Sequence, residues 1–546
     1  MSFIENNLID ALKQSLKEAF DFDAPENFIM LEIPGRPEQG DYATNLAMRL
    51  TKQLKRNPRE IAEAIKASVE NLDMLEKVEI AGPGFINFFM KPTVLAEVIN
   101  NVLTLGSAYG STNTGENKKV LVEYVSANPT GPLHVGHARG AAWGDSLTRI
   151  LKFAGFEVLR EFYVNDLGNQ ITNLSHSLYA RYKQAHGLEA ALPEDGYHGP
   201  DIIEIAAEVM SKEGDKWLDA KQEDWEPYFK ALGIELELKR IEKDLAYFGV
   251  NFDSWVSEKS LYEAGRVEDT LDKLKQTNYT YESDGALWFR STDFGDDKDR
   301  VLIKSDGSYT YLVPDIANHL YKIERGYHHL LNLWGGDHHG YIARMKAALE
   351  AFGHKDVLDV DIIQMVRLVE GGVEVKMSKR TGNAVGLVEL AEDISVDAAR
   401  YFFVSRSLQT PLDFDLDLAR SQTNENPVYY AQYAHARISS LIKRVENFEE
   451  PENLDGLIHP KEIELLKSVN EFPSVVSSTA LTRNVQHIPN YVHSLAQMLH
   501  SYYGEVKIND PSNMNLTSQR IKLLMAVQTT LRNALDLIGV SAPDSM

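Results

Sequence analysis

The sequence predicts an α/β fold in which a parallel sheet forms the central domain, with a small α+β domain before it and an all-helical domain after it. Residues 119–164 hold a nearly continuous apolar strand, a helix that stops at Gly155, and a second strand. This β–α–β order favours parallel strands joined by a right-handed crossover. From about residue 423 onward, apolar residues recur at helical spacing, which indicates a helical bundle.

Length and local composition predict how the chain divides. A chain of 546 residues is too long for one hydrophobic core. Residues 107–119 are rich in Gly, Ser, Thr and Asn and predict a linker. The helical, charge-rich stretch of about 183–285 is typical of an insertion into the sheet domain. We expect an N-terminal domain over 1–110, the sheet domain over 111–370, a connecting segment over 371–422 and the helical domain over 423–546.

The composition narrows the class of protein. With 43% hydrophobic and 25% charged residues, the chain is typical of globular proteins in water, and no apolar run approaches the roughly 18–20 residues that span a bilayer. Because the chain has no cysteine, disulfides, cysteine-bound zinc and thiol catalysis are excluded. These features predict a cytoplasmic protein. The net charge of −24 disfavours a nucleic-acid partner but leaves the sign of any single groove open.

Residues 134–137, HVGH, follow the first strand of the β–α–β unit, where open α/β sheets bind ligands. His134 and His137 could be a metal pair, but zinc would need a third ligand. They could equally be a buried core pair. They could also belong to a nucleotide site, because a helix N-terminus attracts anions, Gly136 lets a flat base approach the backbone, and imidazoles donate to phosphate oxygens. The motif alone leaves these three interpretations open.

A second motif, VKMSKRTGNAVGL, occupies residues 375–387. Lys376 and Lys379 bracket Met377 and Ser378, and a short basic loop by itself is usually a solvated surface. In combination with HVGH upstream, however, it resembles the KMSKS-type loop of the class I aminoacyl-tRNA synthetases, whose other signature is a HIGH-type tetrapeptide. Val replaces Ile in the first signature, and Arg replaces the final Ser of the second. The resemblance implies a Rossmann-like catalytic domain.

Two pairs of residues indicate which amino acid such a synthetase would bind as its substrate. Glu123 and Asn128 lie near the end of the first strand, in EYVSAN, and Tyr311 precedes Asp315 by four residues. Glu123 could simply be a solvent-exposed strand residue and Asp315 a helix N-cap. If their carboxylates converge, they require a cation, and a guanidinium accepts bidentate pairing best. These segments, with YVNDLGNQ and WGGDHHGY, resemble bacterial arginyl-tRNA synthetases, which implies arginine-binding roles for all four residues.

The resemblance also implies an ATP site. Asp337, directly after a core strand, could accept hydrogen bonds from ribose hydroxyls, with His338 near the nucleotide. A rival remains open, because Asp-His-His also occurs in metal phosphoesterases. Mg²⁺ is expected to arrive with ATP, so we expect no metal held by the protein. The implied ATP-binding residues are His134, Gly136, His137, Asp337, His338, Met377, Ser378 and Lys379, and the implied catalytic residues are His134, His137, Lys376 and Lys379.

Both ends of the chain resemble the tRNA-binding parts of the arginyl-tRNA synthetases. GDYATNLAM and GPGFINFFM resemble the N-terminal appended domain, which implies that Phe85 and Asn87 contact tRNA. The C-terminal region resembles the anticodon-binding domain, where Tyr429 and Tyr503 could stack on unpaired bases. At helical spacing, most such tyrosines are core residues.

The resemblance therefore implies an arginine–tRNA ligase. It would join L-arginine to ATP as arginyl-adenylate and transfer the arginine to the 3′-terminal adenosine of tRNA(Arg), releasing AMP and pyrophosphate. It implies a monomer without membrane contacts that needs bound tRNA for activation. The alternative is another class I aminoacyl-tRNA synthetase or a synthetase-like adenylating enzyme.

Overall fold

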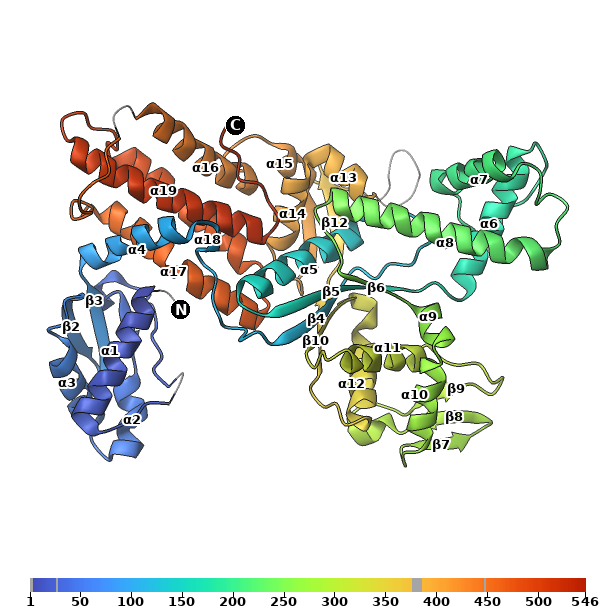
Figure 1. Ribbon diagram of the computed structural model, residues 1–546, viewed down its shortest axis with the longest axis horizontal. Coiled ribbons are helices and arrows are strands. Elements are labelled where there is room, and N and C mark those ends of the chain that lie inside the picture. The colour runs from blue at the N-terminus through green and yellow to red at the C-terminus, as the bar shows by residue number, and fades with distance from the viewer. Residues whose placement is uncertain (1–2, 26–27, 376–384, 446–447) are drawn as a thin grey trace.

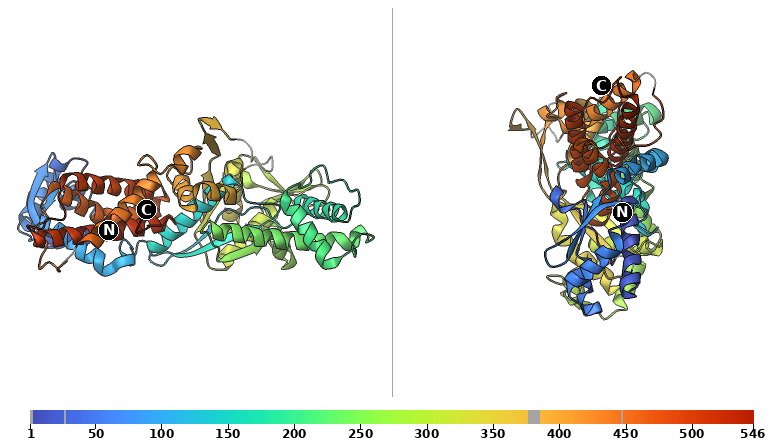
Figure 2. Two further views of the ribbon diagram at one scale, coloured as in Figure 1. Left: turned by 90° about the horizontal axis from the view of Figure 1, so that it is seen from above. Right: turned by 90° about the vertical axis from the view of Figure 1, so that its left-hand side faces the viewer.

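The chain forms an elongated molecule, in which the sheet domain lies between a projecting helical unit at one end and a helical bundle with the N-terminal domain at the other (Figure 1). The computed structural model describes residues 3–25, 28–375, 385–445 and 448–546. Figure 2 shows the same order of parts from above. Within these ranges, no helix combines the length and the apolar character needed to cross a bilayer.

The N-terminal domain packs helices against a three-stranded antiparallel sheet of order β1-β3-β2. Its elements are α1 (Phe3–Phe20), η1 (Pro37–Gln39), β1 (Tyr42–Thr44), α2 (Leu46–Leu54), α3 (Pro58–Val69), β2 (Leu75–Ala81) and β3 (Phe85–Met90). Side chains alternate along β3, so that Ile86 and Phe88 enter the core while Phe85 and Asn87 lie on the opposite face. Asn87 is nevertheless largely covered.

A five-stranded parallel sheet forms the central domain and confirms the predicted fold class. In spatial order the strands are β11 (Leu358–Ile363), β10 (Leu330–Gly335), β4 (Lys119–Glu123), β5 (Glu157–Val164) and β6 (Ser254–Ser257). The helices and 3-10 helix around it include α5 (Val135–Phe153) between β4 and β5, α11 (Leu312–Glu324), η4 (Gly336–Tyr341) and α12 (Ile342–Ala351). In the sheet, β5 and β6 lie on one side of β4, whereas β10 and β11 lie on the other side. Ligands bind at the carboxyl ends of strands at such a switch point.

The structure divides the stretch of 183–285 at β6, which lies within it and pairs in parallel with β5. Before β6, α6 (Asn169–Ala185), α7 (Pro200–Glu213) and α8 (Gln222–Tyr247) share their own core and project from the sheet domain (Figure 1). After β6 come α9 (Glu258–Glu263), α10 (Arg266–Lys275), β7 (Thr280–Ser283), β8 (Ala286–Phe289), η3 (Ser291–Phe294) and β9 (Arg300–Ile303). A four-residue strand among charged helices carries too little alternation to be recognised in the sequence.

The C-terminal part begins with a small sheet, which the sequence did not predict, and ends as the predicted helical bundle. The first portion contains β12 (Val366–Glu370), β13 (Val373–Glu374), α13 (Leu387–Ile394), α14 (Val396–Val404), β14 (Leu412–Asp415) and α15 (Leu416–Arg420). The bundle contains α16 (Pro427–Arg444), α17 (Pro460–Thr482), α18 (His487–Glu505) and α19 (Met514–Leu537). On β14, Leu412 and Phe414 are buried while Asp413 and Asp415 are exposed, so these acids lie on a solvated strand face.

One helix from the early part of the sequence belongs to the C-terminal bundle. α4 (Pro92–Leu105), followed by η2 (Gly106–Ala108), contacts α17 and α19. Its side chains Leu95, Val98, Ile99 and Val102 are almost fully buried. Residues that the sequence groups with the N-terminal domain therefore complete the core of the bundle.

Two truncations test this placement of α4. Removing residues 1–90 leaves α4 on the bundle, whereas removing 1–105 also takes away its buried aliphatic side chains, each worth about 1.5–3 kcal/mol of burial. We expect the longer truncation to melt several degrees below the shorter one in differential scanning calorimetry. Equal melting temperatures would show that α4 does not stabilise the bundle.

Candidate active site

The HVGH motif forms the N-terminus of α5 near the carboxyl end of β4. His134 is the N-cap residue, and its Nδ1 accepts a hydrogen bond from the Gly136 amide at 3.0 Å. His137 Nδ1 accepts from the His134 amide at 3.3 Å. The two rings stack with their centroids 3.8 Å apart. The start of the helix therefore fixes both rings, because its otherwise unpaired amides need acceptors.

These hydrogen bonds determine where the rings carry their protons. A ring nitrogen that accepts a hydrogen bond has no proton, so the proton of each neutral imidazole is on Nε2. Burial lowers the pKa of His134, and burial together with the neighbouring His134 lowers the pKa of His137 to about 3. At neutral pH each ring therefore offers one Nε2–H donor and no positive charge.

Gly136 makes room for the His134 ring. A Cβ at this position would lie 2.9 Å from Cε1 of His134, because the imidazole folds back over the helix start. Gly136 does not have a positive φ, so the backbone itself does not demand a glycine. The sequence led us to expect space for a base; the structure adds a closer reason, which is space for the histidine itself.

The last residues of the second motif are bonded directly to the start of the first motif. The amide of Leu387 donates to the carbonyl of Leu133 at 2.8 Å, and the carbonyl of Val385 accepts from the amide of Val135 at 3.1 Å. The residues between them form an antiparallel bridge. Four predicted site residues lie outside the described residues: Lys376, Met377, Ser378 and Lys379. The described chain resumes after them at Val385, beside HVGH.

Three carboxyl groups lie near the Tyr163 side chain, where β4, β5 and β6 end. Glu123 is the last residue of β4, and Glu258 follows β6 directly. Glu258 accepts a hydrogen bond from Tyr163 Oη at 3.1 Å, and Asp315 on α11 accepts from Tyr341 Oη at 2.5 Å. Burial and all three carboxylates raise the pKa of Tyr163. The three carboxyl groups therefore lie near one phenol, and we refer to this cluster as the carboxyl pocket.

Only one of these carboxylates has a cationic partner among the described residues. Glu123 pairs with the buried Nζ of Lys322, whereas no described Lys or Arg forms an ion pair with Glu258 or Asp315. Burial raises the pKa of Glu258, and burial, opposed by the Tyr341 hydrogen bond, raises that of Asp315 to about 7. Two carboxyl groups without a cation suit a positively charged ligand, and a guanidinium can bond to both.

The sequence analysis assigned no role to four side chains of this cluster: Glu258, Tyr163, Tyr341 and Lys322. The usable signal for Glu258 is an acid at the end of a parallel strand, which is also the position of Glu123. That signal stays hidden because β6 is only four residues long. Tyr163 and Tyr341 stand in the segments YVNDLGNQ and WGGDHHGY, which resemble the family but suggested no role for these tyrosines. No motif marks Lys322.

The remaining predicted residues of the small-molecule site are more accessible. Asn128 donates its side-chain amide to Gln170 Oε1 at 2.6 Å. Tyr311, at the start of α11, is 73% exposed and is not enclosed with the carboxylates. Asp337 and His338 lie on η4 directly after β10 and pair at 3.5 Å. Within the described ranges, no three metal-binding side chains come together, at η4 or elsewhere.

The predicted tRNA contacts lie on two separate surfaces. Phe85 and Asn87 share the β3 face that points away from the core of the N-terminal domain. On the bundle, Tyr429 lies parallel to the exposed Tyr433, with ring centroids 6.2 Å apart. Tyr433 and Tyr503 both line a cleft of about 470 Å³ beside α16. Aromatic rings are thus available on this surface for stacking.

The parallel sheet, its switch point and the HVGH helix start are the features of a class I aminoacyl-tRNA synthetase. The family described as tRNA synthetases class I (R), catalytic domain, matches residues 98–408. The arginyl tRNA synthetase N terminal domain matches residues 6–90, and the DALR anticodon binding domain matches residues 431–546.

Relatives of full length make the assignment specific. Arginine–tRNA ligase 1 of Halalkalibacterium halodurans is 52% identical, over 99% of this chain and 100% of its own length. Arginine–tRNA ligase of Geobacillus kaustophilus is 51% identical over the same shares. The solved structure of Thermus thermophilus arginyl-tRNA synthetase has the same fold, with a TM-score of 0.75 at 22% identity over 99% of this chain and 100% of that one. The chain belongs to the arginyl-tRNA synthetases and is an arginine–tRNA ligase that uses ATP and tRNA.

Gly136→Ala separates the geometry of the motif from the stability of α5. Alanine favours a helix over glycine by about 1 kcal/mol, so the melting temperature should stay the same or rise. Its Cβ would displace the His134 ring, and we expect arginine-dependent pyrophosphate exchange to fall about 10- to 100-fold. Gly504→Ala, at an open glycine of α18, is the matched control. Undiminished exchange in Gly136→Ala would show that His134 does not need its observed position.

Proposed function

We propose that arginine is activated at the switch point of the sheet, with both signature motifs on the triphosphate and the carboxyl pocket on the arginine side chain. The strongest support is the backbone bonding of residues 133–135 to 385–387, which joins the described end of the second motif to the first motif. The carboxyl pocket lies at the same edge of the sheet, since Glu123 and Glu258 stand where β4 and β6 end. The proposed ATP site is completed by Gly136, Asp337, His338, Met377 and Ser378.

The first step requires alignment and charge dispersal. A carboxylate oxygen of arginine attacks the α-phosphorus of ATP, the mixed anhydride bond forms, and the bond to pyrophosphate breaks. The Nε2–H groups of His134 and His137, with the N-terminus of α5, would hold the phosphate oxygens as charge develops. Lys379, supported by Lys376, would stabilise the leaving pyrophosphate. Mg²⁺ bound with ATP supplies further neutralisation of phosphate charge.

The carboxyl pocket would select arginine over lysine. Asp315 and Glu258 would bind the guanidinium, while Glu123 and Asn128 are our candidates for the α-amino end and Tyr311 for the entrance. Lysine would present one compact ammonium in place of a planar fork with five donors, leaving carboxylate oxygens unpaired. Each unpaired buried group costs about 1–3 kcal/mol, or roughly a 5- to 150-fold preference for arginine.

The second step passes the arginine to the 3′-terminal adenosine of tRNA(Arg) and releases AMP. We expect Phe85 and Asn87 on β3, and Tyr429 and Tyr503 on the bundle, to contact the tRNA, since unpaired bases stack on aromatic side chains. The need for tRNA during activation, the monomeric state and the cytoplasmic location stay predictions.

Asp315 should make arginine binding depend on pH. Because its pKa lies at about 7, the carboxyl group is protonated in acid and then cannot pair with a guanidinium. We expect kcat/KM for arginine to rise about tenfold per pH unit below the pKa and to level off above it. Asp315→Asn should abolish this rise and increase the KM for arginine far more than the KM for ATP. An equal increase in both would remove Asp315 from the arginine site.

Exchange of labelled pyrophosphate into ATP tests the whole proposal. Exchange should require arginine among the standard amino acids, and tRNA(Arg). Lys379→Ala should reduce it about 10²- to 10³-fold without changing the melting temperature, because the leaving group loses its charge partner. Lys355→Ala, at an exposed surface lysine, is the control. Exchange without arginine, or wild-type exchange in Lys379→Ala, would contradict these roles.

A further inference from the structure

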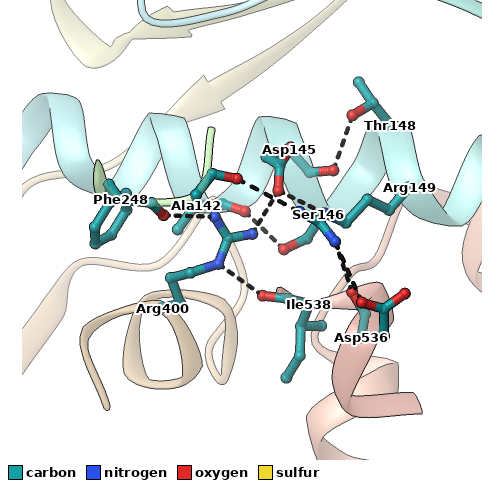
Figure 3. A network of polar contacts seen from close by, with 10 residues as sticks. Ala142, Asp145, Ser146, Thr148, Arg149, Phe248, Arg400, Asp536 and Ile538 are labelled. Carbon is teal, nitrogen blue, oxygen red and sulfur yellow. Dashed lines mark hydrogen bonds and ion pairs between the residues drawn. The ribbon is translucent and has the colours of Figure 1, made fainter. Parts of the chain in front are cut away.

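A buried polar network connects the helix that carries HVGH with the helical bundle (Figure 3). Arg400, on α14, is fully buried. Its Nη2 donates to Asp145 Oδ2 on α5 at 2.6 Å, its Nε to the Ile538 carbonyl at 2.9 Å, and its Nη1 to the Phe248 carbonyl at 3.1 Å. Since Phe248 is the C-cap residue of α8 and Ile538 that of α19, one guanidinium joins four helices.

The two carbonyls belong to matching helix ends. Each helix is followed by a left-handed glycine, Gly249 (φ 77°) after α8 and Gly539 (φ 65°) after α19. In both, the amide after the glycine bonds back to the last turn. Helix C-termini carry partial negative charge, so both ends attract the Arg400 guanidinium. The space for it depends on Gly539, because a Cβ there would overlap the guanidinium.

A second arginine makes the same connections from α5. Arg149 Nε donates to Asp145 Oδ2 at 2.7 Å, Nη1 to the Asp536 carbonyl at 3.2 Å and Nη2 to the Gly249 carbonyl at 3.4 Å. Asp145 is 1% exposed, and its Oδ1 has no hydrogen-bond partner among the described residues. The carboxylate is therefore fixed through one oxygen by two guanidinium groups. The bundle holds α5 through directional polar contacts as well as through apolar packing.

We propose that Arg400 is a positioning residue, which places α5, and with it the HVGH rings, according to the position of α19. Asp145 lies eight residues from His137 along one continuous helix, or about 12 Å, so a shift at Asp145 reaches the helix start. α19 lies within the match to the anticodon-binding domain. A tRNA bound there would thus act on the site of activation through Arg400. The inference rests on the proposed role of HVGH.

Arg400→Lys tests this coupling, since lysine keeps a positive charge for Asp145 but cannot bond to both helix ends in the same geometry. We expect the single-turnover rate of arginylation at saturating tRNA to fall about 10- to 100-fold, with the Kd for tRNA at its wild-type value. Arg160→Lys is the matched control. Native Arg160 forms a bidentate pair with Asp253 in the same domain, which lysine cannot reproduce, and it bonds to neither Asp145 nor α19. The Arg160→Lys variant should react at the wild-type rate.

A double-mutant cycle with His137→Asn distinguishes positioning from a general structural loss. The Asn Oδ1 can replace Nδ1 as the acceptor at the helix start, but the Nε2 donor is missing. If Arg400 acts through HVGH, Arg400→Lys should have little further effect in that background. The coupling would be overturned if the two substitutions reduced the rate independently, so that their fold-losses multiplied in the double mutant. An unchanged rate in Arg400→Lys, or weaker tRNA binding in place of a slower reaction, would also overturn it.

Failure of the proposed function gives a different result in this cycle, because His137→Asn alone would then keep full activity. If Arg400→Lys does not fold, Arg149→Lys is measured by the same criteria, since the Arg149 side chain is 35% exposed and leaves no buried gap. A smaller loss of rate, again absent in the His137→Asn background, supports the coupling. Fold-losses that multiply in the double mutant overturn it.

Discussion

Two backbone hydrogen bonds between residues 133–135 and 385–387 hold together parts of the chain that lie far apart in the sequence. They join the start of α5, which follows the middle strand of the sheet, to the segment that enters α13. Since the donors and acceptors are backbone groups, any residue other than proline can supply them at these positions. The ATP site that we propose depends on this joint, because it connects the described end of the second signature segment to the first.

The proposed site would bind the negatively charged phosphates and the positively charged guanidinium with different kinds of groups. At the phosphate end it offers neutral Nε2–H donors and a helix N-terminus, because burial keeps His134 and His137 uncharged. At the arginine end it offers Asp315 and Glu258, while the third acid of the pocket is already paired with a lysine. In this proposal, a chain with a net charge of −24 would bind a triphosphate through local dipoles and the lysines of one loop, and a guanidinium through two acids.

Features that depend on a local sequence pattern were predictable from the sequence. Features that depend on contacts between distant segments were not. The β–α–β unit and the helical C-terminal domain each follow from the spacing of apolar residues. Glu258 did not, since β6 is too short to show a strand pattern. The apolar face of an amphipathic helix does not indicate which segment it packs against. The sequence therefore grouped α4 with the N-terminal domain, whereas in the structure it contacts α17 and α19. The protonation of His134 and His137 follows from hydrogen bonds that exist only in the folded turn.

Both signatures should act on one triphosphate, and a crystal structure with a nonhydrolysable ATP analogue and arginine tests this most directly. We predict that Nε2 of His134, Nε2 of His137 and Nζ of Lys379 lie within hydrogen-bonding distance of phosphate oxygens of the same analogue. An analogue seated at α5 with Lys379 turned to solvent, out of reach of every phosphate in all copies of the molecule, would contradict the account.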